Sequence, residues 1–125
     1  MNKILAEYIS ICSQFRKDGL SKPERKQRHA MLSEWATNIH TDEIPELAEL
    51  CEFRDCYGEL CYNNLFIKSI IMPVVADDFE NNGIDGIKFL FSCFRGHDRL
   101  YNDANSPISI FCDAIGYKYN PIQLA

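Results

Sequence analysis

The sequence predicts an all-α fold: a single-domain helical bundle of about five to six helices around a long apolar central helix. Three observations predict it. Apolar residues recur three and four positions apart in several segments, which is the spacing of one helix face. Glycines and capping signals separate these segments, and no alternating strand partner is visible. At 125 residues and 46% hydrophobic content, the chain is long enough for one real core, so the predicted domain spans residues 1–125.

The central helix is predicted over residues 59–83. Its middle, residues 65–76, carries a single charge, Lys68, so other elements must cover it on most sides. Pro73 removes a backbone hydrogen bond inside a helix, and its ring clashes with the carbonyl four residues earlier. We therefore expect either a kink at Pro73 or a break into two shorter helices. Gly83 fits the left-handed position that ends many helices.

Two helices are predicted before residue 40. The first covers residues 2–18, and Gly19 ends it. The second begins at Ser21, because a serine followed three residues later by Glu24 forms a capping box. Its first turns are basic, with Lys22, Arg25, Lys26 and Arg28. Its later half is apolar, with Met31, Leu32, Trp35, Ala36 and Ile39.

The third helix is predicted to begin at a cap formed by Thr41 or Asp42. Glu43 and Glu46 in its first turns suit the positive end of the helix dipole. Gly58 is expected to separate it from the central helix, although one long helix through Gly58 stays possible. Its buried stripe is predicted to consist of Ile44, Leu47, Leu50 and Cys51.

Two further helices are predicted after Gly83. Asp85 can cap the first, over residues 86–95. A buried strand, IKFLFSCF, is the competing interpretation, because a short apolar run does not distinguish a helix from a strand. Residues 96–105 read as a polar loop. Ser106 and Pro107 open the last helix, Gly116 ends it, and the tail after it is irregular.

No catalytic or metal-binding motif is found, so the protein is predicted not to be an enzyme and to bind no metal or cofactor. Residues 51, 56 and 61 are cysteines five positions apart, which scatter around a helix instead of converging on zinc. His29, His40 and His97 stand in no His-Glu-x-x-His arrangement, and no glycine-rich phosphate loop is present. The six cysteines lie mostly in apolar runs, typical of reduced thiols: Cys12, Cys51, Cys56, Cys61, Cys93 and Cys112.

Neither nucleic acid nor a membrane is a predicted partner. The formal charge of −5 and the pI of about 5.1 are unlike the dominant basic face of a nucleic-acid binder. The apolar run at residues 65–76 is shorter than the roughly 20 residues that a membrane span requires. Glu7 interrupts the apolar N-terminal stretch and no small-residue cleavage site follows it, so we expect no signal peptide and a cytoplasmic protein.

The distribution of charge is the informative feature. Residues 1–40 hold seven Lys or Arg and four Asp or Glu, whereas residues 41–85 hold two Lys or Arg and eleven Asp or Glu. A dense surface of one sign steers a partner of the opposite sign, and aromatic residues among charges are favoured at interfaces. The alternative is a solubilising helix face that needs no partner. The predicted partner-binding residues are Asp42, Glu43, Glu46, Glu49, Glu52, Asp55, Tyr57 and Glu59.

In overall character along the whole chain, this small, acidic, mostly helical sequence with reduced thiols and a concentrated acidic face resembles the bacterial immunity proteins of contact-dependent inhibition and related polymorphic toxin systems. The resemblance implies binding to a cognate toxin domain, often a basic nuclease, and blockage of its active site. A helical adaptor or regulatory protein is the alternative function. An enzyme with a pocket that the sequence does not reveal is the third.

Overall fold

The computed structural model describes residues 1–15 and 19–94, and 81% of these residues are helical, with no strand among them. The predicted helical class is therefore confirmed. The chain divides into two compact units, Met1–Ile70 and Ile71–Ala125, which are described in turn. The polar loop at 96–105, the helix predicted from Ser106 and the tail lie outside the described residues.

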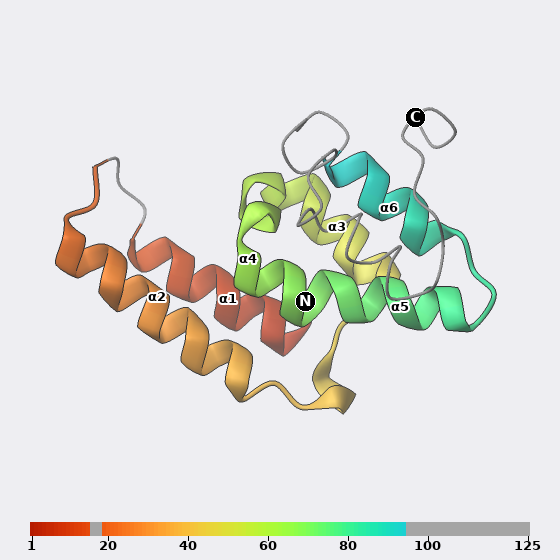
Figure 1. The fold of residues 1–125 in the computed structure, drawn as a ribbon, viewed down its shortest axis with the longest axis horizontal. Helices are drawn as coiled ribbons and strands as arrows, with labels where there is room; N and C mark the ends of the chain where they lie inside the picture. Colours follow the sequence, from red (N-terminus) through yellow and green to blue (C-terminus); the bar gives the residue numbers. More distant parts are fainter. Residues whose placement is uncertain (16–18, 95–125) are drawn as a thin grey trace. The chain divides into compact units, whose positions relative to one another are not determined.

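The first unit begins with two antiparallel helices, α1 (Lys3–Gln14) and α2 (Lys22–Thr37), which lie side by side (Figure 1). The predicted capping box opens α2: Ser21 Oγ accepts from the Glu24 amide at 3.3 Å, and Glu24 Oε1 accepts from the Ser21 amide at 3.1 Å. Helix α1 starts later than predicted, because Asn2 is its N-cap and accepts from two amides of the first turn.

The predicted start of the third helix is wrong. Thr41–Glu43 form only a short 3₁₀ helix, η1, and α3 covers Leu47–Tyr57 with Glu46 as its N-cap. Pro45 is the physical reason: a proline disfavours helical geometry in the residue before it, and Ile44 is extended, with φ −64° and ψ 133°. Helix α3 begins after that proline.

The predicted central helix begins at Asn64, not at Glu59. Gly58 is the C-cap of α3, which ends at Tyr57, so the third helix ends at the predicted residue; but Gly58 has right-handed helical angles, φ −51° and ψ −38°, and opens a 3₁₀ helix, η2 (Gly58–Tyr62), before the predicted central helix. Asn63 makes a second separation, between η2 and the helix that follows. It is extended, and its Oδ1 accepts from the amides of the first turn of α4 (Asn64–Phe66) at 2.9 and 3.2 Å.

Pro73 is accommodated by a change of helix type. Residues 64–80 are helical throughout, but a π-helical turn, η3 (Ile67–Ile71), stands between α4 and α5 (Met72–Glu80). Pro73 lies at the start of α5, where a helix tolerates a residue without an amide hydrogen. One long α-helix through residues 59–83 is therefore not observed.

The core of the first unit is an aromatic cluster contributed by four helices. The ring centroids of Tyr8 on α1 and Trp35 on α2 are 4.9 Å apart, and those of Tyr8 and Phe66 on α4 are 4.5 Å apart. Phe53 on α3 stacks on Phe66 at 5.2 Å. The polar atoms of the cluster are satisfied by backbone carbonyls: the Tyr8 hydroxyl donates to Leu60 O at 2.6 Å, and Trp35 Nε1 donates to Ile4 O at 3.2 Å.

The second unit is described from Ile71 to Phe94, as a pair of packed helices, α5 and α6 (Asp85–Phe94). The strand alternative for this apolar run is therefore wrong. Asn82, with φ 64°, takes the left-handed position that was predicted for Gly83. Asp78 Oδ2 accepts from the Gly86 amide at 2.8 Å, so a carboxylate of α5, and not Asp85, binds the first turn of α6.

Candidate functional site

The seven predicted carboxylates, here called the acidic segment, run through η1, α3 and η2 of the first unit. They do not share one helix face with the predicted aromatic anchor. Tyr57 follows Glu52 by five residues, which is a rotation of about 140° at about 100° per residue. Its ring packs against Phe53 at 5.5 Å, so Tyr57 turns towards the core side of α3 while Glu52 is exposed. The acidic segment comprises Asp42, Glu43, Glu46, Glu49, Glu52, Asp55 and Glu59.

Two of these carboxylates stabilise the local backbone. Glu43 Oε1 accepts from the His40 amide at 3.3 Å, and its other oxygen lies 4.0 Å from Lys3 Nζ. Glu49 Oε1 accepts from the Glu46 amide at 3.4 Å, at the N-terminus of α3. For these two residues, the acidic side chain has a structural role that needs no partner protein.

Other carboxylates of the segment face outward. Asp55 Oδ1 lies 3.6 Å from Arg54 Nε, which offsets part of its charge. Asp42, Glu46, Glu52 and Glu59 are exposed and form no ion pair with any residue that the structure describes. Much of the acidic segment therefore carries negative charge that its surroundings leave uncompensated.

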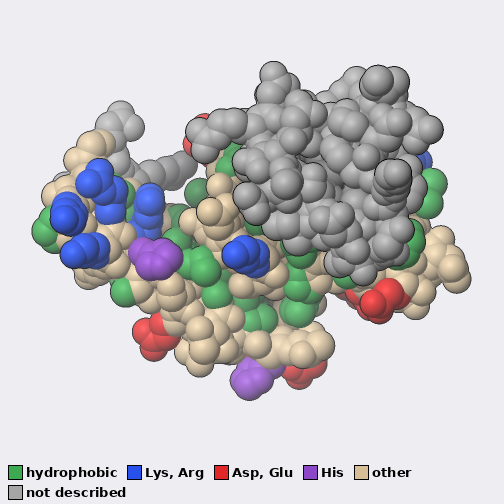
Figure 2. Space-filling view, viewed as in Figure 1, with side chains coloured by type: hydrophobic (Ala, Val, Ile, Leu, Met, Phe, Trp, Pro, Cys, Tyr) green, Lys and Arg blue, Asp and Glu red, His purple; other side chains and the backbone are tan. Residues whose placement is uncertain are grey.

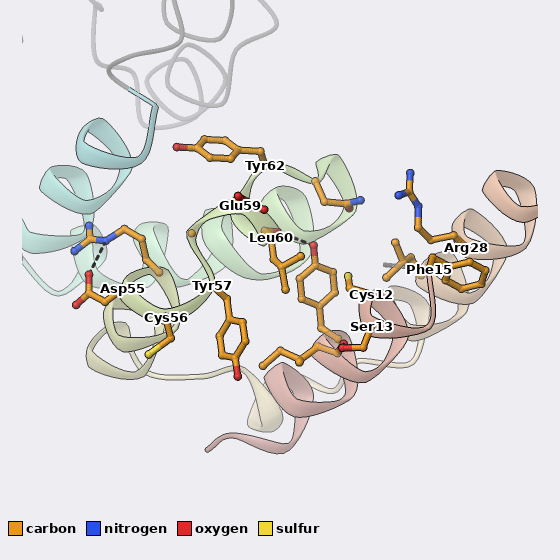
Figure 3. A pocket seen from close by; sticks show the side chains of 16 residues that line it. Cys12, Ser13, Phe15, Arg28, Asp55, Cys56, Tyr57, Glu59, Leu60 and Tyr62 are labelled. Carbon is orange, nitrogen blue, oxygen red and sulfur yellow. Dashed lines mark hydrogen bonds and ion pairs between the residues drawn. The ribbon is translucent and has the colours of Figure 1, made fainter. Parts of the chain in front are cut away.

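A hollow of about 970 Å³, here called the α1–η2 groove, lies beside the end of the acidic segment (Figure 3). It brings together three predicted site residues, Asp55, Tyr57 and Glu59, from the corner where α3 continues into η2. The other five predicted residues do not line it. Its other wall residues come from α1, Phe15 after it and α2 on one side, and from α3 and η2 on the other; they include Tyr8, Cys12, Phe15, Arg28, Leu32 and Tyr62.

The groove is lined by charged residues of both signs, Arg28 and Arg54 with Asp55 and Glu59. Arg28 projects from α2 on one side, whereas Asp55 and Glu59 come from the α3–η2 corner on the other, where the side chains of Tyr57 and Glu59 point in different directions (Figure 3). Arg54 lines the same side and lies 3.6 Å from Asp55. Ile9 and Leu32 contribute apolar surface to the groove, although its lining is more polar than apolar. Such a groove is suited to a partner segment that presents a basic group to one side and a hydrogen-bond acceptor to the other.

Two groups that line the groove, Cys12 and Tyr8, have a raised pKa. Burial raises the pKa of the Cys12 thiol, so the thiolate that would act as a nucleophile is disfavoured at neutral pH. Burial likewise raises the pKa of Tyr8, with a further contribution from Cys12, and the Tyr8 hydroxyl is already engaged with Leu60 O. Both groups are therefore held in their neutral forms at neutral pH.

A second charged feature lies at the start of α2. Figure 2 shows Lys and Arg side chains gathered over this end of the helix. Lys22, Arg25 and Lys26 are exposed, as expected of a solvated face, whereas Arg28 is half-buried and belongs to the groove. Within residues 1–15 and 19–94, no group of three His, Cys, Asp or Glu side chains is placed to hold a metal ion. No described helix is long and apolar enough to cross a membrane.

The sequence did not reveal the groove, because its walls come from segments far apart in the chain. The sequence did indicate that Arg28 faces the inner side of α2, because it lies four residues before the buried Leu32. Tyr62 could not be placed in the same way, because the change from α3 to η2 alters the helical period after Tyr57.

Comparison with known proteins gives no further guide to the site: no protein-family model, no curated protein and no solved structure matches this chain.

Proposed function

We propose that the protein is an immunity protein or antitoxin, which binds a basic toxin domain through the acidic segment and the adjoining α1–η2 groove. A basic nuclease is the class of toxin domain that the resemblance implies. One observation carries the proposal: exposed carboxylates, several of them without an ion-pair partner in the described residues, extend from Asp42 to Glu59 and end at a groove with aromatic walls.

The physical argument separates two contributions. Uncompensated carboxylates create a negative potential that accelerates encounter with a basic surface. The groove then provides concave, partly apolar surface for the short-range contacts that slow dissociation. A surface that only keeps the protein soluble requires the exposed carboxylates but no groove. The groove beside the acidic segment therefore favours a binding role.

The alternative function is a helical adaptor or regulatory protein that uses the same surface for a partner without toxicity. The acidic segment and the groove support this function equally well, because both describe how a basic partner binds and not what it does. An enzyme is the third class. The 970 Å³ groove is the feature in its favour, and the raised pKa of Cys12 is the feature against it.

Co-expression tests the proposal directly. If the protein is an immunity protein, its toxin is expected to be encoded by the reading frame directly upstream. The product of that reading frame is expressed in bacteria alone, with this protein, and with a variant in which Asp42→Asn, Glu46→Gln and Glu52→Gln are combined. The expected result is growth arrest by the upstream product, relief by the wild-type protein and weaker relief by the variant. A complex with a non-toxic upstream product would support the adaptor function instead. Absence of both relief and complex formation would refute the proposal.

A further inference from the structure

We infer that copies of this chain associate head to tail at low ionic strength, with the basic first turns of α2 of one copy bound in an acidic groove between α1 and α2 of the next. The two surfaces are here called the basic stripe, which comprises Lys22, Arg25 and Lys26, and the α1–α2 groove. The inference goes beyond the proposed function and does not rest on it. Of the acidic segment, only Glu43 lines the α1–α2 groove.

The basic stripe occupies one exposed face of α2. Arg25 and Lys26 follow Lys22 by three and four residues, the spacing that places side chains next to one another on a helix. All three are exposed, and none forms an ion pair with a residue that the structure describes. The carboxylate of Glu24 is engaged in the capping box with Ser21. A face that only keeps a protein soluble usually mixes charges of both signs, so a stripe of one sign is suited to an anionic partner.

The α1–α2 groove, a hollow of about 580 Å³, carries more carboxylates than cations. Glu7 from α1, Glu34 from α2 and Glu43 from η1 line it, whereas Lys3 is the one Lys or Arg among its described lining residues. Lys3 Nζ lies 3.9 Å from a Glu7 oxygen and 4.0 Å from a Glu43 oxygen, so one cation is shared between two carboxylates. Glu34 is exposed and forms no ion pair within the described part of the chain. The groove therefore keeps an excess of negative charge.

The lining of the α1–α2 groove is also suited to the stems of basic side chains. Its surface is more apolar than polar, with Ile4 and Ile11 from α1 and Met31 from α2 among its residues. Lys and Arg can lay their aliphatic stems along apolar surface while their charged ends reach carboxylates at its edge. A basic helix face therefore complements this groove in both charge and polarity.

A single chain cannot bring the two surfaces together. Lys22 and Glu34 are twelve positions apart on α2, which is about 18 Å along the helix axis, whereas an ion pair requires a separation of about 4 Å or less. A second copy can supply the missing surface. Because the stripe of one copy meets the groove of the next, every contact leaves one free stripe and one free groove, and association continues into chains.

The association should be weak and salt-dependent. The formal net charge of −5 makes copies repel one another, so only the local complementarity of stripe and groove favours contact. We expect a dissociation constant on the order of 1 mM at low ionic strength. Salt should weaken the association further, because exposed ion pairs are screened.

Dilution of the ¹⁵N-labelled full chain tests the inference. Amide spectra and the rotational correlation time are recorded between about 0.05 mM and about 1 mM protein, at ionic strengths of about 0.01 M and about 0.15 M. At the lower ionic strength, the correlation time should rise with protein concentration. The accompanying amide shifts should be confined to the first turns of α2 and to the residues of the α1–α2 groove. At the higher ionic strength, both changes should be reduced at least several-fold.

Two double reversals separate this contact from a general effect of net charge. Lys22→Glu with Lys26→Glu reverses the stripe, and Glu7→Lys with Glu34→Lys reverses the groove. Each should abolish the concentration dependence up to about 1 mM, although the second makes the chain less negative, which by itself favours association. The fourfold variant has the wild-type net charge with both surfaces exchanged in sign, and should regain association. Lys68→Glu is the control, because Lys68 is exposed and belongs to neither surface, and it should change the dissociation constant by less than about twofold.

Three results would overturn the inference: no concentration dependence at low ionic strength, stronger association after reversal of the groove, or a fourfold variant that is folded but does not associate. Circular dichroism establishes that each variant is folded, as expected for substitutions at exposed positions. None of these measurements involves the upstream product, so their failure leaves the proposed function untouched.

Discussion

Two groups of aromatic side chains in the unit Met1–Ile70 show how one residue type serves two purposes. In the core, Tyr8 and Trp35 are buried, and each donates its polar hydrogen to a backbone carbonyl of the same unit. At the groove, Tyr57 is half-buried and Tyr62 is 42% exposed. Polar atoms that are satisfied inside the protein stabilise the fold. The Tyr57 hydroxyl, for which no hydrogen bond is found among the described residues, remains accessible to a partner. Substitutions in the core group should therefore lower the stability of the fold, whereas substitutions at the groove should change binding to a partner.

The largest expected effect is in the core. Phe66 is fully buried, at 0% exposure, and its ring contacts Tyr8 and Phe53. Phe66→Ala should lower the free energy of unfolding by about 3–5 kcal/mol, because it removes buried surface and leaves a cavity. Urea denaturation followed by circular dichroism measures the loss. A loss below about 1 kcal/mol, within the range of surface substitutions, would break the distinction between core and groove.

The hydroxyl of Tyr8 should make stability fall at alkaline pH. Burial raises its pKa in the folded state, so its contribution to stability is complete below about pH 10, the usual pKa of tyrosine, and is lost as the pH rises above that value. The raised pKa of Cys12 acts in the same direction, starting at lower pH. Tyr8→Phe should remove the part of the loss above about pH 10, but cost about 1–3 kcal/mol at neutral pH because Leu60 O loses its donor.

The measurement is the urea midpoint between about pH 8 and pH 11 for the wild type, for Tyr8→Phe and for Tyr57→Phe. The Tyr57 variant is the control, since no hydrogen bond of its hydroxyl is found among the described residues. The same alkaline fall in all three proteins would contradict the assignment to Tyr8.

Within the acidic segment, the same comparison separates two neighbouring glutamates. Glu49 Oε1 accepts from the Glu46 amide at the start of α3, whereas Glu52 is exposed. Glu49→Ala should therefore destabilise the protein by about 0.5–1 kcal/mol, and Glu52→Ala by less than about 0.5 kcal/mol. Thermal unfolding of the two variants under one buffer condition tests this difference. Equal losses would show that Glu49 has no capping role.

Local signals in the sequence were sufficient for the helical class and for some helix ends. The Ser21–Glu24 capping box needed only two residues three positions apart, and the apolar run before residue 95 is helical as predicted. The start of α3 differs from the prediction although its signal is local, because Pro45 disfavours helical geometry at Ile44. The change of helix type before Pro73 lay between the two expected outcomes, a kink or a break.

Features that depend on distant contacts could not be predicted. Asp78 binds the first turn of α6 only because α5 and α6 pack together, and the sequence instead favoured the adjacent Asp85. The groove likewise requires α1, α2 and the α3–η2 corner to meet. The sequence therefore predicted Asp55, Tyr57 and Glu59 from charge and composition, but not Arg28 as the opposing wall.

The most direct test of the central claim is the association rate with the upstream product at two ionic strengths, about 0.01 M and about 0.15 M, where the screening lengths are about 30 Å and about 8 Å. The protein is compared with the variant that combines Asp42→Asn, Glu46→Gln and Glu52→Gln, all outside the groove. The account predicts that the variant associates more slowly at low salt, that the two rates converge at high salt, and that dissociation is unchanged. Equal association rates of the two proteins at both ionic strengths would show that the acidic segment does not steer the partner.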